Sequence, residues 1–504
     1  MKTILFVSLS VALLVLISLG CQKRKPPVVD PGETPTNQDT MDLKRVAVEP
    51  KRVEGGKFPA TKPDLERKLN EVDTPYIVPK GPERGKMRPR NKGSNIKKMD
   101  TQNPDDDGGS QAPLRFRTYD ELDDATPSAH RLVPEPSVAE NGQTVMTTGN
   151  FWMALSENGG AQFTSVNPTT IFPRLRRVLL RPGAPVHTQY DLFVWLLQYS
   201  SKDRVNAIRI ACKPPRACAT PTPPPGRTGD FTNTALASSG ALDYNDMSVG
   251  DNFLYWTSSI GGGQNRYVIR VPLQELQAMG TVNFQFTGST NAYWSHVTQN
   301  GSNGVYWAGH KDNSTMIVYS MMDADGFYSW RDVAVNSWPN NTISSTASDG
   351  NDWLADASWK TYVRAAATRR SRILFAWNAS KGDGFPHPHV QIAEINPANF
   401  TLTNQMQIWN PDFAFAYPYF ETNAEGELGM IVAFGGGSFN ASSGVGVWGD
   451  FVIYYPRLSS VSKTNYGHYH TARRAGGNGM EWVGAGYTYE SDGSVLPYYV
   501  RFSR

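Results

Sequence analysis

Cysteine is scarce in this chain of 504 residues, which contains only Cys21, Cys212 and Cys218. The last two have a short Lys-Pro-Pro-Arg-Ala loop between them and no neighbouring Cys or His, so the sequence argues against a zinc site. Charged residues are also few, at 19% of the chain, and the net charge is only +3. We therefore expect no nucleic-acid partner.

Long amphipathic helices are missing too. The best candidate, Leu273 to Met279, is shorter than three turns, and this favours an all-β class. The chain also contains no Gly-x-Ser-x-Gly, no His-Glu-x-x-His, no phosphate-binding loop and no dinucleotide fingerprint. The enzyme classes that depend on those motifs are therefore excluded.

The first 21 residues have the pattern of an export signal. Met1-Lys2-Thr3 supplies a positive start, Ile4 to Leu19 is an apolar run, and Gly20-Cys21 follows directly. A small residue before Cys21 resembles the lipobox of bacterial lipoproteins, which implies a lipid on this cysteine. We expect an exported protein, lipid-anchored to the cell envelope at the outer membrane or cell surface. The alternatives are an ordinary cleaved signal and an uncleaved anchor helix. In such an oxidising compartment we expect Cys212 and Cys218 to form a local disulfide.

Residues 22–130 are poor in aromatic residues and rich in Pro, Lys, Arg, Asp and Gly. Such a composition buries too little apolar surface to offset the entropy of ordering, so we predict a disordered tether. Within it, the stretch from Lys80 to Lys98 is strongly basic. We favour a solvated linker for this stretch. The alternative is a segment that docks on an anionic envelope polymer or on lipid head groups.

Residues 131–504 have a sequence pattern that predicts many short strands. Runs of β-branched and aromatic residues recur between Gly, Asn, Asp, Ser and Pro, and they amount to about two dozen. An open sheet of that size would leave exposed edges, whereas radial repetition of four-stranded blades gives about six or seven blades. We therefore predict a monomeric all-β protein with a β-propeller of about six or seven blades. The alternative is two β-sandwiches in tandem.

One segment matches a known turn pattern: Ser156-Glu157-Asn158-Gly159-Gly160-Ala161-Gln162-Phe163. It resembles the Asp-box of sialidase-like propellers, Ser-x-Asp-x-Gly-x-Thr-Trp, with Asn158 in place of Asp and Phe163 in place of Trp. The Ser156 and Asn158 side chains suit backbone donors, Gly160 supplies a positive φ, and Phe163 pins the turn to its blade. In that family the box is structural, so the resemblance implies a fold but does not identify an activity.

The resemblance extends over most of residues 132–504, to a group of secreted sialidase-like propellers known mainly by their fold. It rests on segments distributed along the domain: 135–163, 191–211, 242–257, 375–390 and 484–501. The stretch Tyr466-Gly467-His468-Tyr469 departs from it, because those proteins tend to carry Gly-Asp-Tyr there. A role for that acid is therefore in doubt for this chain.

A true sialidase needs three arginines that clamp a carboxylate, a Tyr nucleophile helped by a Glu, and an acid/base Asp. The Arg-Ile-Pro signature expected near the start of the domain is missing, and Phe172-Pro173-Arg174 does not reproduce it. We expect most of the remaining arginines to be solvated. Those that can contribute to an anion site are Arg364, Arg369, Arg370, Arg372, Arg473 and Arg474.

Two histidine pairs are candidates for ligand binding, His387 with His389 and His468 with His470. Residues two apart on a strand point to the same face, so either pair can bind a divalent metal with a carboxylate such as Asp246 across the propeller axis. The interpretation we favour is that they are ordinary polar residues at strand faces and loop ends. We predict no other cofactor.

The function predicted from these features is presentation of a propeller that binds a glycan or a protein ligand. Asp243, Asp246 and Arg364 are the candidate ligand residues besides the histidines. The alternative is a glycan-acting hydrolase with a divergent site, which two carboxylates clustered with a Tyr or His in the central depression would favour. For several tryptophans we favour a place in the blade core over a role as sugar-stacking platforms: Trp256, Trp294, Trp307, Trp330, Trp353 and Trp448.

Overall fold

The structure, a computed structural model, describes most of the chain from Asp39 onwards. The described residues are 39–49, 51–52, 78–89, 91–99, 114–123, 135–149, 152–166, 186–187, 192–200, 206–213, 227–238, 240, 242–260, 265–278, 280–355, 361–464, 466–477 and 479–504. No helix within these ranges is long and apolar enough to cross a membrane. Cys21 and Cys218 lie outside them, so the lipid anchor and the disulfide stay predictions, and Cys212 lies on strand β12.

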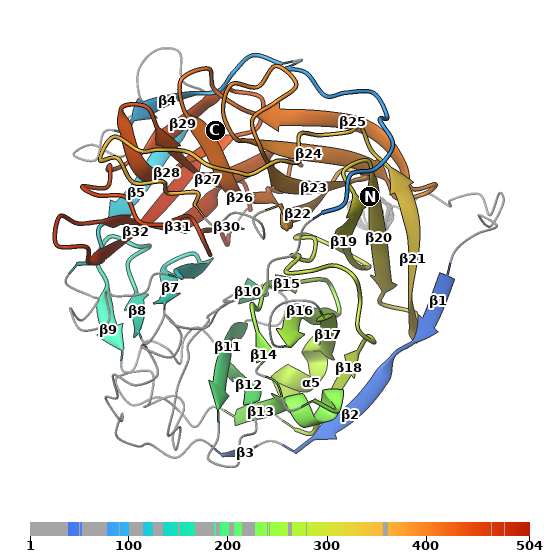
Figure 1. Cartoon of the computed structure of the whole chain (residues 1–504). Coiled ribbons are helices and arrows are strands. Elements are labelled where there is room, and N and C mark those ends of the chain that lie inside the picture. Colours follow the sequence, from blue (N-terminus) through green and yellow to red (C-terminus); the bar gives the residue numbers. More distant parts are fainter. Residues whose placement is uncertain are drawn as a thin grey trace, which may run out of the picture. The chain divides into compact units, whose positions relative to one another are not determined.

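The strands of the described residues form seven sheets around a central axis (Figure 1). Each sheet contains an antiparallel meander that forms a propeller blade, and the blades are numbered in chain order. Blade 1 contains β6 (Ser137–Asn141), β7 (Thr144–Gly149), β8 (Trp152–Ser156) and β9 (Thr164–Val166). Blade 2 contains β10 (Val186–His187), β11 (Leu192–Ser200), β12 (Asn206–Lys213) and β13 (Arg227–Thr232). Blade 3 contains β14 (Leu242–Asp243), β15 (Met247–Val249), β16 (Phe253–Ile260), β17 (Asn265–Pro272) and β18 (Val282–Phe286).

Blade 4 contains β19 (Gly304–Asp312), β20 (Thr315–Met322) and β21 (Phe327–Ala334), and blade 5 contains β22 (Val363–Arg369), β23 (Arg372–Ala379), β24 (His389–Asn396) and β25 (Thr401–Ile408). Blade 6 contains β26 (Ala414–Thr422), β27 (Leu428–Gly436), β28 (Phe439–Val447) and β29 (Val452–Tyr455). Blade 7 contains β30 (Thr471–Arg474), β31 (Trp482–Tyr489) and β32 (Val495–Ser503). Helix α5 (Leu273–Ala278) has a single turn or so, as its sequence predicts. The predicted all-β propeller is confirmed.

The hydrophobic core lies between neighbouring blades. Val318 of blade 4 and Phe375 of blade 5 belong to one buried cluster, and Ile392 of blade 5 and Phe434 of blade 6 belong to the next. Strands β26 and β27 are buried along their whole length, because each packs between two other sheets. On β18, by contrast, buried and more exposed residues alternate as expected for a strand with one covered face.

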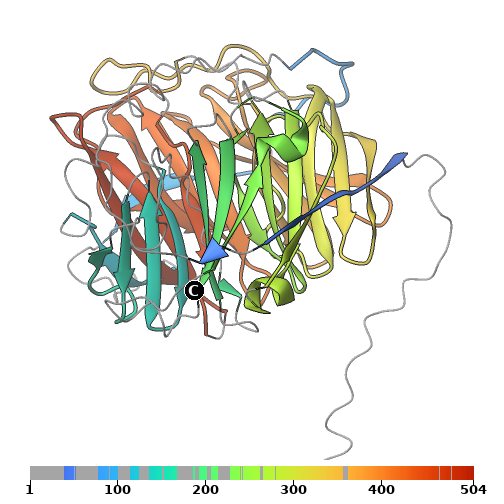
Figure 2. The same ribbon diagram turned by 90° about the horizontal axis from the view of Figure 1, so that it is seen from below.

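Five strands that precede blade 1 complete the outer edges of five blades. β1 (Asp39–Asp42) pairs with β21, β2 (Lys44–Val48) with β18, and β3 (Lys51–Arg52) with β13. β4 (Asn95–Lys98) pairs in parallel with β29, and β5 (Arg115–Asp120) pairs with β32. Figure 2 shows β1 and β2 as one blue ribbon across the outer edges of blades 3 and 4. We call β1 to β5 and the segment 78–99 the N-terminal belt.

The belt corrects the prediction that residues 22–130 are a disordered tether and that the propeller begins at residue 131. The prediction weighed side chains alone, whereas the belt is ordered largely through its backbone, which satisfies the open edges of blades. β5 also supplies the outer strand of blade 7, so the chain before blade 1 is tied to its C-terminal end. The prediction is therefore wrong for every described part of this region.

The basic segment 78–99 lies against the blades. The Gly81 amide donates to Asn313 Oδ1 at 2.7 Å, the Arg84 amide donates to Ser337 Oγ at 2.7 Å, and Met87 is completely buried. Its charged side chains remain exposed, namely Lys80, Arg84, Lys86, Arg88, Lys92, Lys97 and Lys98. Solvated side chains agree with the interpretation that we favoured, but the backbone that carries them is bound.

The Asp-box segment forms the turn between β8 and β9 of blade 1. Ser156 Oγ accepts from the Gly160 amide at 2.9 Å, and Asn158 Oδ1 accepts from Ser156 Oγ at 2.8 Å and from the Gln162 amide at 3.0 Å. Gly160 has a φ of 91°. The Phe163 ring packs edge-on against Tyr499 of blade 7, with ring centroids 5.4 Å apart. The turn therefore links the first blade to the last.

Gly160→Ala is expected to destabilise the protein by about 2–5 kcal/mol, because it adds left-handed strain and an overlap in a packed site. A Cβ at this position would lie 2.2 Å from Tyr499 Cε1. Gly142→Ala is the matched control, since Gly142 has a φ of 69° but open space around it, and only the strain of about 1–2 kcal/mol is expected there. Urea denaturation measures both. Equal losses in the two variants would contradict the packing role of the turn.

Candidate functional site

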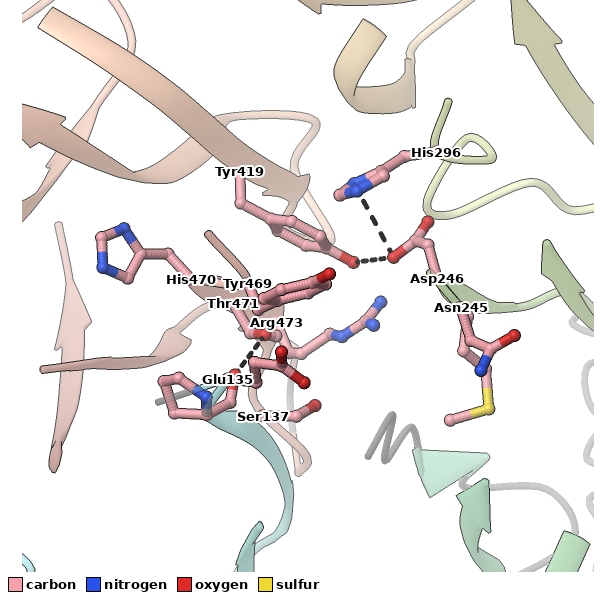
Figure 3. Close-up of a pocket in the computed structure, with 12 residues that line it drawn as sticks. Glu135, Ser137, Asn245, Asp246, His296, Tyr419, Tyr469, His470, Thr471 and Arg473 are labelled. Carbon is pink, nitrogen blue, oxygen red and sulfur yellow. Dashed lines mark hydrogen bonds and ion pairs between the residues drawn. The ribbon is translucent and has the colours of Figure 1, made fainter. Parts of the chain in front are cut away.

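A pocket lies near the central axis, where loops and inner strands of blades 1, 3, 6 and 7 meet the loop that precedes blade 4 (Figure 3). Its empty volume, including the part that is continuous with solvent, is about 410 Å³. The lining residues are Glu135, Pro136, Ser137, Asn245, Asp246, Met247, His296, Tyr419, Tyr469, His470, Thr471 and Arg473. Because they come from chain positions hundreds of residues apart, the pocket exists only in the closed propeller.

Asp246, directly before β15, is the hub of the pocket wall and is almost completely buried. Its Oδ1 accepts from the Tyr419 hydroxyl at 2.9 Å, and its Oδ2 accepts from the Val297 amide at 3.2 Å. Gln299 Nε2 lies 3.4 Å from the same Oδ2. Figure 3 shows Tyr419, His296 and Asp246 pointing toward one another, with His296 Nδ1 3.8 Å from Asp246 Oδ1.

Tyr419 reaches Asp246 because β26 is irregular. The register of β26 against β27 shifts between Ala416 and Tyr419, and Tyr417 within the bulge has a φ of 52°. A bulge of this kind re-aims the side chains that follow it. Burial raises the pKa of Tyr419 well above its ordinary value, Arg473 opposes the shift, and Asp246 adds to it. Tyr419 is therefore a neutral phenol that donates to Asp246.

Arg473 on β30 supplies the guanidinium of the pocket, and the carboxyl group of Glu421 lies beside it. Its Nη1 donates to Gln299 Oε1 and lies 3.9 Å from Glu421 Oε2, while its Cζ lies 5.2 Å from the centre of the Tyr419 ring. Burial lowers the Arg473 pKa, but Tyr419, Glu421 and Asp246 outweigh it and the net direction is upward. Burial also raises the pKa of Glu421, against the pull of Arg473.

His296 is a neutral imidazole at pH 7. Burial lowers its pKa to about 4; Asp246 works against this shift, while Arg266 and Arg473 reinforce it. Its ring lies 5.4 Å from the Tyr419 ring and 5.9 Å from the Tyr244 ring, measured between centroids. The pocket thus holds a hydrogen-bonded carboxylate and phenol, a neutral imidazole and a guanidinium that donates through Nη1 to Gln299.

The structure brings some of the predicted site residues together at this pocket. Asp246 and His470 line it, although the His470 ring points away from Asp246 in Figure 3 and packs on Tyr466 and Tyr487. His468 Nε2 lies 3.1 Å from the Tyr417 hydroxyl. Both histidines lie in the turn before β30 and not on a strand, so the strand alternation that paired them does not apply to this segment.

Asp243 and Arg364 lie beside the pocket without lining it. Asp243 Oδ1 accepts from the Tyr244 amide at 2.7 Å. The Arg364 guanidinium is buried on β22, within 5.1 to 5.7 Å of the ring centres of Tyr244, Tyr417 and Tyr362. Arg364 thus packs among the aromatic side chains around the pocket, while Asp243 bonds the backbone of Tyr244.

The other histidine pair lies elsewhere, in blade 5. His389 is completely buried at the start of β24, stacks on Phe385 with ring centroids 3.7 Å apart, and lies 2.8 Å from Gln391 Nε2. His387 is only half-buried. Among the described residues, no group of three or more His, Cys, Asp and Glu side chains is placed to hold a metal ion.

Sequence reasoning missed several residues of the site: Glu135, His296, Tyr419, Glu421 and Tyr469. Tyr419 and Glu421 did carry a signal, because they are polar residues at a spacing of two in strand β26, which begins with the apolar run Ala414–Ala416. Such residues on an inner strand point to the axis of a propeller. Glu135 and His296 lie in loops, where no periodicity identifies them.

Comparisons with known proteins leave the family open: no family model matches, and no curated protein matches. Solved structures match at low similarity. A protein called AofleA from Arthrobotrys oligospora is 9% identical over 73% of this chain and 96% of its own, with a TM-score of 0.34. A subtype N11 neuraminidase-like protein of a flat-faced bat isolate is 9% identical over 85% and 96%, with a TM-score of 0.35. An exo-1,5-α-L-arabinanase from a bovine ruminal metagenomic library is 7% identical over 74% and 98%, with a TM-score of 0.32. Similarity this low carries no argument about function, which must come from the pocket.

Proposed function

We propose that the central pocket binds a neutral sugar unit of a glycan. The observation that carries this proposal is the charge of the lining: two carboxylates, Glu135 and Asp246, and one guanidinium, Arg473. Sugar hydroxyls donate to carboxylates and accept from hydroxyl, amide and guanidinium donors, so a polyhydroxylated ligand suits this lining. Pro136 and Met247 offer apolar surface to the C–H groups of the ring.

An acidic sugar suits the same pocket poorly. Specific recognition of a carboxylate commonly uses several arginine donors, and here Arg473 is the one guanidinium of the lining, with its Nη1 already donating to Gln299 and lying 3.9 Å from Glu421 Oε2. A ligand carboxylate would also bring negative charge close to Asp246 in a buried site, where like charges disfavour each other strongly. We therefore expect the pocket to discriminate against sialylated glycans.

Glycoside hydrolysis is the second candidate function, and one observation favours it. Two carboxylates, Glu135 and Asp246, line the same pocket with Tyr419 and His296. Hydrolysis of a glycosidic bond commonly uses a pair of carboxyl groups on either side of that bond. The hydrolase would need the same sugar to bind first, so both candidates predict binding and only one predicts products.

Asp246→Asn is expected to lower the affinity for a neutral glycan at least tenfold, because the amide replaces a charged acceptor at the hub of the pocket. The full-length protein is incubated with a panel of neutral and sialylated glycans, and retained glycans and products are read by mass spectrometry. Asp332→Asn is the control, since Asp332 is an exposed residue of β21 paired with Lys311.

Retention of neutral glycans by the wild-type and Asp332→Asn proteins, with loss in Asp246→Asn, supports the proposal. Cleavage products that disappear in Asp246→Asn would establish the hydrolase instead of a binding protein alone. Preferential retention of sialylated glycans, or retention that is the same in all three proteins, would overturn the assignment of this pocket.

A further inference from the structure

Five aromatic side chains form a continuous cluster beside the polar pocket. Tyr244, Trp294 and Tyr362 are buried, and Tyr293 and Tyr469 are half-buried and pack on them. We call these five residues the aromatic ledge. The ring centroids of Tyr244 and Trp294 are 4.6 Å apart, and those of Tyr244 and Tyr469 are 5.0 Å apart. Tyr293 and Tyr362 are stacked, with an interplanar angle of 21°.

The ledge is continuous with the pocket. Tyr469 belongs to both, since it lines the pocket and packs on Tyr244. In Figure 3 its ring extends from the loop before β30 toward the side of Asp246. A ligand held at Asp246 therefore has an aromatic surface next to it, and part of that surface is accessible.

The backbone around the pocket and ledge is strained in a way that singles them out. Of the eleven non-glycine residues with positive φ among the described residues, five lie here: Glu135, Tyr244, Trp294, Tyr417 and Tyr469, with φ between 51° and 89°. A left-handed conformation is unfavourable for bulky aromatic residues. Such strain persists only where the surroundings impose it, and it concentrates at binding and active sites.

The loop that carries Tyr469 is held rigidly from below. The buried Tyr466 hydroxyl donates to the Tyr487 carbonyl at 2.6 Å, and the Gly467 amide donates to the Tyr487 hydroxyl at 2.8 Å. Gly467 has a φ of 97°, and a Cβ there would lie 2.6 Å from Tyr417 Cδ2. The half-buried Tyr469 ring is thus pre-positioned, which lowers the cost of ordering it when a ligand binds.

We infer that the aromatic ledge is a second subsite, which stacks the sugar ring next to the one held in the polar pocket. The apolar C–H face of a pyranose fits a flat aromatic ring, whose face is electron-rich, while the tyrosine hydroxyl stays in contact with water. The ligand is accordingly a neutral oligosaccharide of at least two units. This inference rests on the proposed function of the pocket.

The test compares disaccharides with their monosaccharide units by titration calorimetry on the full-length protein. The probes are cellobiose, mannobiose, galactobiose and chitobiose, with the matching methyl glycosides. We expect the best disaccharide to bind at least tenfold more tightly than its methyl glycoside. Tyr469→Ala should remove about tenfold of the disaccharide affinity and change the methyl glycoside by less than twofold, and Tyr469→Phe should retain both. Tyr267→Ala, at a half-buried tyrosine of β17, is the control for the loss of an aromatic ring elsewhere.

The outcomes distinguish a failure of the aromatic ledge from a failure of the polar pocket. A disaccharide that binds no better than its methyl glycoside, or a Tyr469→Ala variant that weakens both equally, would overturn the ledge and leave the polar pocket standing. Failure of every probe to bind the wild-type protein would overturn the proposed function and the ledge with it. Thermal unfolding of each variant shows that a loss of binding is not a loss of folding.

Discussion

Removal of residues 1–130 is expected to prevent folding of the propeller, although the sequence places the propeller at residues 131–504. The described part of the removed segment buries seven apolar side chains against the blades: Leu43, Val78, Met87, Met99, Leu114, Phe116 and Leu122. At about 1.5–3 kcal/mol each, they contribute about 10–21 kcal/mol, which equals or exceeds the whole stability of a typical domain of about 5–15 kcal/mol.

The same truncation leaves β13, β18, β21, β29 and β32 with open edges. Unpaired edges of this kind recruit other chains, so we expect aggregates. Size-exclusion chromatography with light scattering measures the outcome, and removal of residues 1–38 alone is the control that should leave a folded monomer. A monomeric 131–504 fragment with the thermal transition of the full-length protein would show that the belt is dispensable.

Acidification is expected to destabilise the protein already at pH values well above those at which ordinary carboxylates titrate. Burial lowers the pKa of His296 to about 4 and the pKa values of His310, His389 and His470 to about 3. Each ring is neutral in the folded state and has an ordinary pKa of about 6.5 when unfolded. Below pH 6.5 the unfolded state binds more protons than the folded state, so the free energy of unfolding falls as the pH falls.

Between pH 7.5 and 5.5 each histidine contributes a loss of slightly more than about 1 kcal/mol, and the four together about 5 kcal/mol. Glu421 and Glu140, whose pKa values burial raises, have the opposite sign and offset part of this loss. Urea midpoints at the two pH values measure the difference. His470→Phe should reduce it by about 1 kcal/mol, because one titrating group is lost. A midpoint that is unchanged or higher at pH 5.5 would contradict the account.

The fold could be predicted from the sequence because blades are local. Each meander is built from consecutive strands whose residues alternate and whose turns carry Gly, Asn and Asp, and Trp256, Trp307 and Trp353 are fully buried, as the core interpretation expects. The belt could not be predicted in this way, since strands such as β3 and β4 have no apolar run and are defined by the edge they meet.

The site was only partly predictable for a related reason. Asp246, Tyr419 and Arg473 come from blades 3, 6 and 7, and no spacing along the chain records how inner strands of different blades face one another. The histidine pairs show the converse, because a spacing of two suggests a shared face without identifying a site. His387 and His389 have the spacing of a shared face, but His389 is buried on Phe385 within blade 5, far along the chain from the residues around Asp246. Spacing identifies a face, and only the closed ring shows what that face meets.

The most direct test of the central claim is a crystal structure of the full-length protein soaked with the tightest-binding neutral disaccharide. We expect one sugar ring within hydrogen-bond distance of Asp246 and Glu135, and the second ring stacked on Tyr469. Sugar bound only on the outer rim of a blade, with the central pocket unchanged, would contradict it.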